Sequence, residues 1–489
     1  MNIRKFFSGV SVGSDISLTV FLQGLTGLLA LGLQPLIARK LGPNGWSTYS
    51  LCMQTYATIG SAILDFGIFA FVFPKVAVSK NFASLPFASA IALRIPTFLL
   101  ATIVTLGVAF AFGNGEYWYL ILSGLFVVFI GSRFPGMRQV MEMIWRNTGR
   151  TWVAAGVGVL DMGLFILALL LIPEIAANSV ISVIVTFFVA NVPGFLIITI
   201  PIIRRYLQTP NAPRRVPIRY LKRVAIGSSP IALMVLSAQV FGRVEPLIIN
   251  AVFGEDLVGG YMAAILPIGG TAFIASTIGI GLQPLIAQAW RGTRNDVKGE
   301  WILSIGTRIL GSVGILIGVF CFIYAEPILS LFGPKFIASA WILRIYALTN
   351  LLELMVMFYD QSLIGINKHR EVMGATIGAL ILALILQIIG VIFWGLPGIL
   401  FGKMATVACK IVYQLTLFSP VWRREAIYSL ARIGGSVLFF AAGIYGMNSL
   451  DLSPIVEGVI LLPAVVGALF FLKVIDLPGI LKLRSIRLG

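Results

Sequence analysis

The sequence has 489 residues, of which 58% are hydrophobic and only 11% are charged, and its formal net charge is +17. Soluble domains carry roughly 25% charged residues, so this composition excludes a water-soluble globular protein and predicts an integral membrane protein. Lys and Arg accumulate in the cytoplasmic loops of membrane proteins, so the positive charge does not indicate a nucleic-acid partner.

Apolar stretches long enough to cross a bilayer recur along the whole chain. A spanning helix needs roughly 20 mostly apolar residues. The stretches that meet this criterion are 14–38, 47–72, 86–112, 117–134, 151–172, 177–203, 224–253, 257–289, 301–325, 337–364, 371–394, 397–420, 427–448 and 453–474. They are too long, and alternate too little, for the strands of a β-barrel. The predicted fold class is therefore an all-α membrane protein with about 14 transmembrane helices.

The cations between these stretches orient the chain. With the N-terminus in the cytoplasm, 25 Lys and Arg residues, among them Arg138, fall in cytoplasmic loops, and only Arg39, Lys40 and Lys335 fall outside. This strong bias follows the positive-inside rule and predicts a multi-pass protein with cytoplasmic N- and C-termini.

An internal repeat predicts two lobes. Residues 34–37 (QPLI) end the first predicted helix, residues 245–248 (EPLI) end the seventh, and two glycines and a tyrosine follow each run. Phe-Gly pairs at 112–113 and 332–333 follow the third and ninth helices in the same way. The matches place helices 1–6 over helices 7–12 in the same orientation, as in a parallel transporter repeat. The predicted domains are an N-terminal lobe at 1–205, a basic cytoplasmic linker at 206–223, a C-terminal lobe at 224–422, and helices 13–14 with a cytoplasmic tail at 423–489.

Five short stretches resemble a known family. They are the run RKLGPNGW at 39–46 and the stretches 64–68, 258–261, 331–336 and 361–368. In these motifs the chain is similar to the polysaccharide flippases of the multidrug/oligosaccharidyl-lipid/polysaccharide exporter superfamily, although Trp46 follows its glycine here. The resemblance implies a protein of the bacterial cytoplasmic (inner) membrane. It would move undecaprenyl-pyrophosphate-linked oligosaccharide from the inner to the outer leaflet by alternating access, for surface polysaccharide biosynthesis.

The same resemblance sets the expected partners. They are the lipid-linked oligosaccharide, membrane lipids and the polysaccharide polymerase machinery, and no nucleic acid. The coupling ion would be H⁺ or Na⁺. The sequence contains no recognisable catalytic, metal-binding or cofactor motif, so we expect neither an enzyme nor a cofactor.

Charged residues inside the predicted spans are the candidate site. Ionisable groups in membrane helices are functional candidates by default, and a buried pyrophosphate needs Arg or Lys. The predicted substrate-binding cations are Arg94, Arg243, Lys403, Lys410 and Arg344. The predicted ion-coupling or gating acids are Asp161, Asp65, Glu245, Glu353 and Asp360, and Asp161 is the best isolated acid of the first half. The alternative for the two lysines is structural pairing with Glu353 and Asp360, because buried ions usually pair.

Three other functions stay open. A lipid II flippase also has fourteen helices and a cationic cavity, but the first helix here lacks a buried arginine. A cation-coupled multidrug exporter of the same superfamily typically has twelve helices and an acidic drug pocket. A membrane-embedded glycan polymerase or ligase belongs to a different class, and typically needs large outer loops, whereas the loops here are short.

Overall fold

A computed structural model describes residues 12–78, 84–132, 134–148, 150–172, 179–210, 212–291, 299–447 and 454–475. The predicted cytoplasmic termini lie outside these residues. Within them, every regular element is a helix. The elements are α2 (Val12–Tyr49), η1 (Ser50–Tyr56), α3 (Ala57–Asp65), α4 (Ile68–Val78), α5 (Leu85–Ala111), η2 (Gly115–Tyr117), α6 (Trp118–Ile130), α7 (Met137–Asn147), α8 (Thr151–Leu171), α10 (Val180–Gln208), α11 (Ile218–Phe241), α12 (Val244–Phe253), α13 (Glu255–Gly269), α14 (Ala272–Trp290), α15 (Gly299–Ile323), α16 (Ala325–Ser330), η3 (Pro334–Ser339), α17 (Ala340–Gly365), α18 (His369–Trp394), α19 (Leu396–Thr416), α20 (Pro420–Met447) and α21 (Pro454–Phe471).

These helices confirm the predicted all-α, multi-pass membrane architecture. Ten helical stretches in the described part of the chain are long and apolar enough to cross a bilayer, and shorter apolar helices cover 115–130, 244–253 and 458–471. One of the ten stretches, Phe21–Asp65, covers most of both the first and the second predicted span. Helices α13 and α14 cover the eighth. Each of the fourteen predicted spans therefore coincides with helix.

A glycine separates the first two spans. Gly42 has φ 69° and ψ 178° inside α2, and Pro43 follows it. The positive φ is a conformation that glycine adopts without a steric penalty, and proline cannot continue the backbone hydrogen bonding of a helix. The Leu-Gly-Pro run of the resemblance motif therefore forms the bend between two membrane helices.

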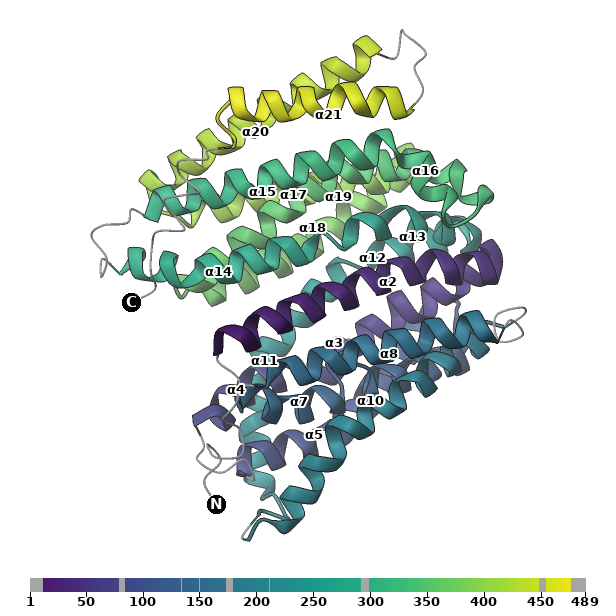
Figure 1. Cartoon of the computed structure of the whole chain (residues 1–489), viewed down its shortest axis with the longest axis vertical. Coiled ribbons are helices and arrows are strands. Elements are labelled where there is room, and N and C mark those ends of the chain that lie inside the picture. Colours follow the sequence, from purple (N-terminus) through teal and green to yellow (C-terminus); the bar gives the residue numbers. More distant parts are fainter. Residues whose placement is uncertain are drawn as a thin grey trace. The chain divides into compact units, whose positions relative to one another are not determined.

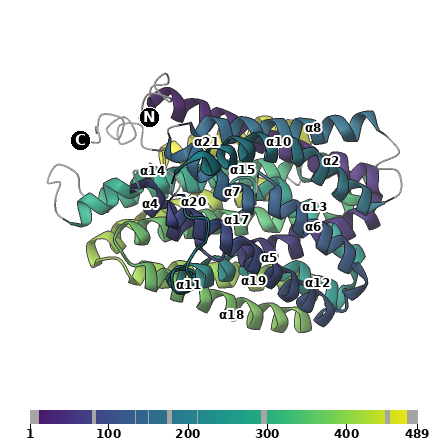
Figure 2. The same ribbon diagram turned by 90° about the horizontal axis from the view of Figure 1, so that it is seen from below.

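The chain divides into two compact units, Met1–Met262 and Ala263–Gly489. This boundary falls later in the chain than the predicted linker at 206–223, because α11 packs against α3, α4 and α5. The predicted repeat and its lobes remain predictions. In the first unit, α2, α8 and α10 lie side by side (Figures 1 and 2). In the second unit, α17 packs against α14, α15 and α19, and α18 packs along α19.

A close approach fixes the packing of α11 on the first unit. Phe66 and Gly67 take left-handed backbone conformations (φ 46° and 64°) between α3 and α4. A Cβ atom at Gly67 would lie 2.7 Å from the carbonyl oxygen of Ser228 in α11. Only glycine fits both the positive φ and this contact. The Asp-Phe-Gly run at 65–67 is therefore a packing element as well as a helix end.

The fourth predicted span is interrupted. Helix α6 has 13 residues and measures about 20 Å at 1.5 Å per residue. It is therefore shorter than the roughly 30 Å hydrocarbon core. The chain leaves the helix at Gly131 and begins α7 at Met137. A Cβ atom at Gly136 would lie 2.3 Å from the carbonyl oxygens of Val128 and Phe129, so the break folds tightly against α6. The prediction of one helix over 117–134 was too long at its inner end.

Candidate functional site

The second unit holds two ion pairs between α17 and α19. Lys403 Nζ lies 3.2 Å from Glu353 Oε1. Lys410 Nζ lies 3.0 Å from Asp360 Oδ2. The structure thus brings together four of the predicted site residues, in the pairing that the sequence left as an alternative. Both lysines are buried, so neither is a bare cation awaiting a ligand.

Neutral side chains support the second pair. Lys410 also donates a 3.1 Å hydrogen bond to the Thr376 hydroxyl of α18. Gln414 Nε2 donates to Asp360 Oδ1 at 2.6 Å. The Lys410, Thr376 and Gln414 side chains are buried. Three adjacent helices therefore fix the position of the Asp360 carboxylate.

The first pair has an aromatic neighbour. The Tyr346 hydroxyl lies 3.5 Å and 3.4 Å from the two carboxylate oxygens of Glu353. The Lys403 ammonium lies 5.9 Å from the centroid of the Tyr346 ring, within the range of a cation–π contact. Tyr346, one helical heptad before Glu353, was not among the predicted site residues. Its place beside Lys403 follows from the packing of α17 against α19.

Arg344 lies outside this cluster. Its Nη2 pairs with Glu326 Oε1 of α16 at 3.0 Å, and the two side chains are 35% and 54% exposed. Glu326 falls in a predicted outer loop. Arg344 is therefore a partly exposed residue near the start of α17, and its assignment as a substrate-binding cation remains a prediction.

Arg94 and Asp65 form a buried pair in the first unit. Arg94 Nη2 lies 3.3 Å from Asp65 Oδ1, and the Arg94 side chain is wholly buried. Arg94 Nη1 also donates a 2.6 Å hydrogen bond to the backbone carbonyl of Leu64. This carbonyl belongs to the last turn of α3, which lacks helical partners. Arg94 therefore ties α5 to the end of α3, and it offers no accessible cation.

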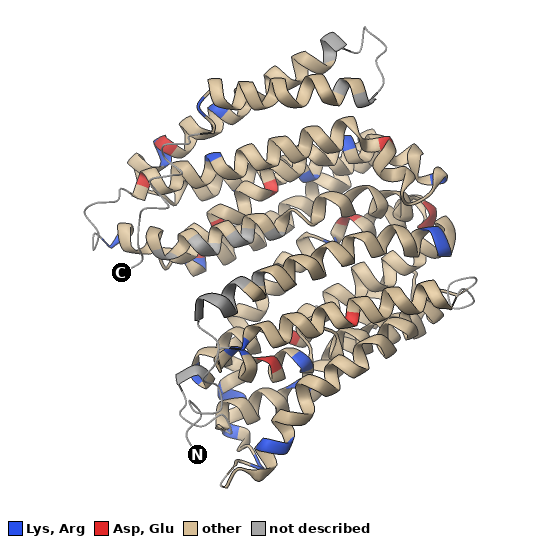
Figure 3. Ribbon diagram, in the orientation of Figure 1, with Lys and Arg blue, Asp and Glu red and all other residues tan. Residues whose placement is uncertain are grey.

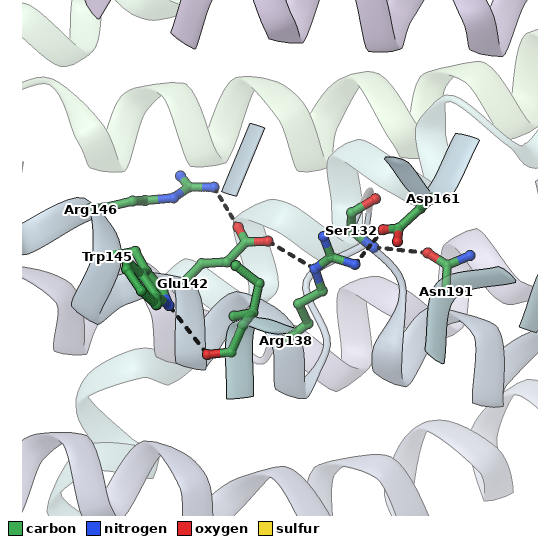
Figure 4. Close-up of polar contacts among 8 residues, drawn as sticks. Ser132, Arg138, Glu142, Trp145, Arg146, Asp161 and Asn191 are labelled. Atoms are coloured by element: carbon green, nitrogen blue, oxygen red, sulfur yellow. Dashed lines mark hydrogen bonds and ion pairs between the residues drawn. The ribbon is translucent and has the colours of Figure 1, made fainter. Parts of the chain in front are cut away.

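Asp161 is part of a second buried network (Figure 4). It pairs with Arg138 Nη1 of α7, and Arg138 Nε pairs with Glu142 Oε1 at 3.2 Å. Glu142 Oε2 in turn accepts a 3.0 Å contact from Arg146. Arg138 and Asp161 are fully buried, whereas Arg146 is 35% exposed. We refer to Arg138, Glu142, Arg146 and Asp161 as the α7 network.

The α7 network corrects two sequence interpretations. Asp161 was expected to be an isolated acid, but it has an arginine partner. Arg138 was assigned to a cytoplasmic loop, but α7 carries it to the middle of α8. The signal for this was the pattern Arg138-x-x-x-Glu142-x-x-x-Arg146, which places the three charges on one face of a helix. Asp161 also faces a tight contact with α10, because a Cβ atom at Gly194 would lie 2.0 Å from Asp161 Oδ1.

Arg243 and Glu245 occupy a second break in a predicted span. Helix α11 ends at Phe241 and α12 starts at Val244, so Arg243 lies in the intervening turn and is half-buried. Glu245 is buried in the first turn of α12, and the Tyr261 hydroxyl lies 3.4 Å from its Oε2. Interrupted membrane helices place backbone polar groups and charges at functional depth in transporters. Arg243 remains a candidate substrate-binding residue.

A polar cluster missed by the sequence analysis joins α12 and α13 to earlier helices of the same unit. Glu255 accepts hydrogen bonds from Thr48 and, at 2.6 Å, from the Tyr117 hydroxyl. Trp46 Nε1 donates to the carbonyl of Gly259 at 3.1 Å. Asn250 Nδ2 donates to Asn114 Oδ1 at 3.1 Å. We call these residues the Glu255 cluster; most of its segments flank the predicted outer loops.

Basic residues of the first unit gather at a different end from the Glu255 cluster (Figure 3). They lie on α4, on α7 and around the connection from α10 to α11, where the predicted cytoplasmic loops fall. Lys75 at this end lies 3.2 Å from the centroid of the Phe71 ring. Burial lowers the pKa of the Lys75 ammonium, and the nearby Arg223 lowers it further. The orientation of this unit in the membrane remains a prediction from the sequence.

Comparisons with known proteins place the fold. The sequence matches no family model and no curated protein. The structure is similar to the lipid II flippase MurJ in an inward closed conformation, with a TM-score of 0.68 and 15% identity over 94% of this chain and 100% of that one. It is also similar to an inward-facing multidrug resistance MATE transporter, with a TM-score of 0.60 and 17% identity over 82% and 97% of the two chains.

A third similar structure is that of a MOP superfamily transporter from Pyrococcus furiosus, for which the reverse polarity of the binding pocket suggests a different function. Its TM-score is 0.56, with 17% identity over 85% of this chain and 97% of that one. At these identities the likeness establishes the fold. The chain has the fold of the MATE and MurJ transporters of the MOP superfamily, spanning nearly the whole length of each.

Proposed function

We propose that the protein is a flippase that translocates undecaprenyl-diphosphate-linked oligosaccharide from the inner to the outer leaflet of the bacterial cytoplasmic membrane. Alternating access would move the substrate, driven by H⁺ or Na⁺, and the product would supply the polysaccharide polymerase machinery. In this proposal both termini face the cytoplasm. The protein acts as a transporter and not as an enzyme, in keeping with the transporters that share its fold.

One observation carries the proposal: membrane helices of this transporter fold contain two charged pairs, Lys403–Glu353 and Lys410–Asp360, whose carboxylates are partly exposed. Charges in such helices are costly and persist where a polar substrate or ion is handled. A wholly apolar cargo would not require them. The family motifs at 39–46 and 361–368 add support from the sequence.

Arg243 is the proposed contact for the diphosphate. It is half-buried at a helix break, in the turn between α11 and α12. The guanidinium group presents donors in a planar fork that matches phosphate oxygens. Asp161, Asp65 and Glu245 remain proposed coupling or gating groups, each now with a defined neighbour.

A lipid II flippase is the second candidate, favoured by the similarity to MurJ over that protein's whole length. Both candidates take a polyprenyl diphosphate that bears sugars, and they differ in the glycan. The lipid that accumulates in the absence of the protein therefore distinguishes them.

The test is deletion of the gene in its host, followed by mass spectrometry of polyprenyl-linked lipids and a leaflet assay. We expect a lipid-linked surface-glycan unit to accumulate on the inner leaflet. Accumulated lipid II would favour the second candidate. Normal outer-leaflet supply of both lipids would overturn the proposal.

Complementation of the deletion strain tests Arg243. Arg243→Ala should reduce flipping about tenfold or more at normal protein level, because hydrogen bonds to charged groups contribute roughly 1.5–3 kcal/mol. Arg223→Ala, an exposed residue of α11 at the end of the predicted linker, is the matched control and should flip normally. Full activity of Arg243→Ala would remove this residue from the site.

A further inference from the structure

The two ion pairs of the second unit form a regular ladder. Each lysine lies 50 positions after its carboxylate partner, and seven residues separate the two pairs on both helices. A constant offset means that α17 and α19 run parallel. Seven residues correspond to about 10.5 Å along a helix. We call the pairs the upper (Glu353–Lys403) and lower (Asp360–Lys410) rungs.

In each rung the carboxylate side chain is partly exposed and the lysine side chain is buried. The carboxylate side chains of Glu353 and Asp360 are 26% and 21% exposed, whereas the side chains of Lys403 and Lys410 are 2% and 6% exposed. A group that approaches either rung therefore meets carboxylate oxygens before it meets an ammonium. This order is unfavourable for a phosphate, because two like charges repel most strongly where solvent screening is weakest.

The carboxylates keep acceptor capacity. An ionised carboxylate has about four lone-pair sites. At Asp360, Gln414 and Lys410 each contact one oxygen, at 2.6 Å and 3.0 Å. At Glu353, the Lys403 contact is 3.2 Å and the Tyr346 hydroxyl lies at the long distances of 3.4 and 3.5 Å. The lysine behind each carboxylate occupies one side of it and leaves the other side open.

We propose that the ladder is a sugar-binding site in which Glu353 and Asp360 accept hydrogen bonds from glycan hydroxyl groups. Lys403 and Lys410 are then positioning residues that hold the carboxylates in place. The inference rests on the proposed flippase function and reverses the roles first expected for these four residues. Ionised carboxylates form strong hydrogen bonds with hydroxyl donors.

The spacing adds a size requirement. About 10.5 Å between rungs exceeds the width of one sugar ring, so the two rungs contact different sugars of one oligosaccharide. The parallel rungs also offer the same chemistry twice along the helix axis. A glycan that slides along the helices by one rung therefore keeps one set of contacts while it exchanges the other.

The experiment measures binding of two probes to the purified full-length protein in nanodiscs. One probe is undecaprenyl diphosphate without sugar, and the other is undecaprenyl diphosphate with a disaccharide of N-acetylhexosamines. Glu353→Gln and Asp360→Asn should each weaken binding of the disaccharide lipid about tenfold. Binding of the sugar-free lipid should change less than twofold, and it also reports that the variants are folded. Glu326→Gln, an exposed carboxylate paired with Arg344 in the same unit, is the matched control.

The positioning role of the lysines has its own readout. Lys410→Arg retains the counter-charge and should preserve binding of the disaccharide lipid, whereas Lys410→Met should weaken it like Asp360→Asn. The inference is overturned if Glu353→Gln or Asp360→Asn tightens binding of the sugar-free lipid, because the lysines would then be the phosphate site. Equal loss of both probes would also overturn it. If the wild-type protein binds neither lipid, the proposed function itself fails.

Discussion

The α7 network and the ladder solve the same electrostatic problem differently. Each region pairs two positively charged side chains with two negatively charged side chains inside a membrane protein. The α7 network encloses its carboxylates: Glu142 is 5% exposed and Asp161 is fully buried. The ladder leaves its carboxylates four to five times more exposed than Glu142. An enclosed ion pair holds its helices together, whereas a partly exposed carboxylate can also contact a large polar ligand. The exposure of the carboxylate, and not its charge alone, therefore distinguishes a structural role from a binding role.

The largest expected effect comes from breaking the α7 network at its centre. Arg138→Ala leaves Glu142 without one cation and Asp161 without its partner. Loss of one member of a buried ion pair costs about 3–5 kcal/mol, because the remaining charge stays buried. We expect a large fall in the thermal unfolding midpoint in detergent and in the yield of folded protein. Arg146→Ala, at the exposed end, is the control and should cost less than about 1 kcal/mol. An unchanged midpoint for Arg138→Ala would contradict the structural role of the network.

A smaller effect is expected from one identical substitution made in both regions. Glu142→Gln removes the charge between two arginines, and should cost about 1.5–3 kcal/mol in unfolding free energy. Glu353→Gln removes a carboxylate that water can reach in part, and should cost about 1 kcal/mol or less. Parallel denaturation of the two variants measures the difference. A greater loss of stability in Glu353→Gln than in Glu142→Gln would contradict this difference between the α7 network and the ladder.

The smallest effect belongs to the exposed pair of Arg344 and Glu326. Exposed ion pairs contribute about 0.2–1 kcal/mol in double-mutant cycles. A cycle with Arg344→Ala and Glu326→Ala should give a coupling free energy in that range. A coupling above about 2 kcal/mol would mean that this pair is shielded from water in the membrane, and would restore Arg344 as a buried cation.

The fold was predictable because it is determined by local properties. Runs of apolar residues coincide with helices, and the Gly42-Pro43 step marks the first bend. The inner end of α6 was placed too far along the chain, although polar Ser132 and Arg133 and then Pro135 follow Gly131. The break folds tightly because of the backbone approach of Gly136 to Val128 and Phe129, which hydropathy does not represent.

The candidate site was predictable in its members but not in their roles. The stripe of Lys403 and Lys410 was visible at helical spacing, and so was its match with Glu353 and Asp360. Relative exposure within each pair depends on three helices and cannot be inferred from one stretch of sequence. Arg138 was misplaced because cations after an apolar run usually indicate a loop. The Glu255 cluster was missed because it joins residues more than a hundred positions apart.

The Glu255 cluster has a consequence for the resting state of a transporter that works by alternating access. Its side-chain hydrogen bonds must separate if α12 and α13 move away from the earlier helices. At about 1 kcal/mol for each bond, and more for the charged acceptor, their sum is several kcal/mol. A difference of about 2.8 kcal/mol already holds two conformations near a ratio of 99 to 1. In the proposed alternating-access transporter, the four hydrogen bonds of this cluster can therefore determine which conformer predominates before substrate binds, and how much of the binding free energy is used to change it.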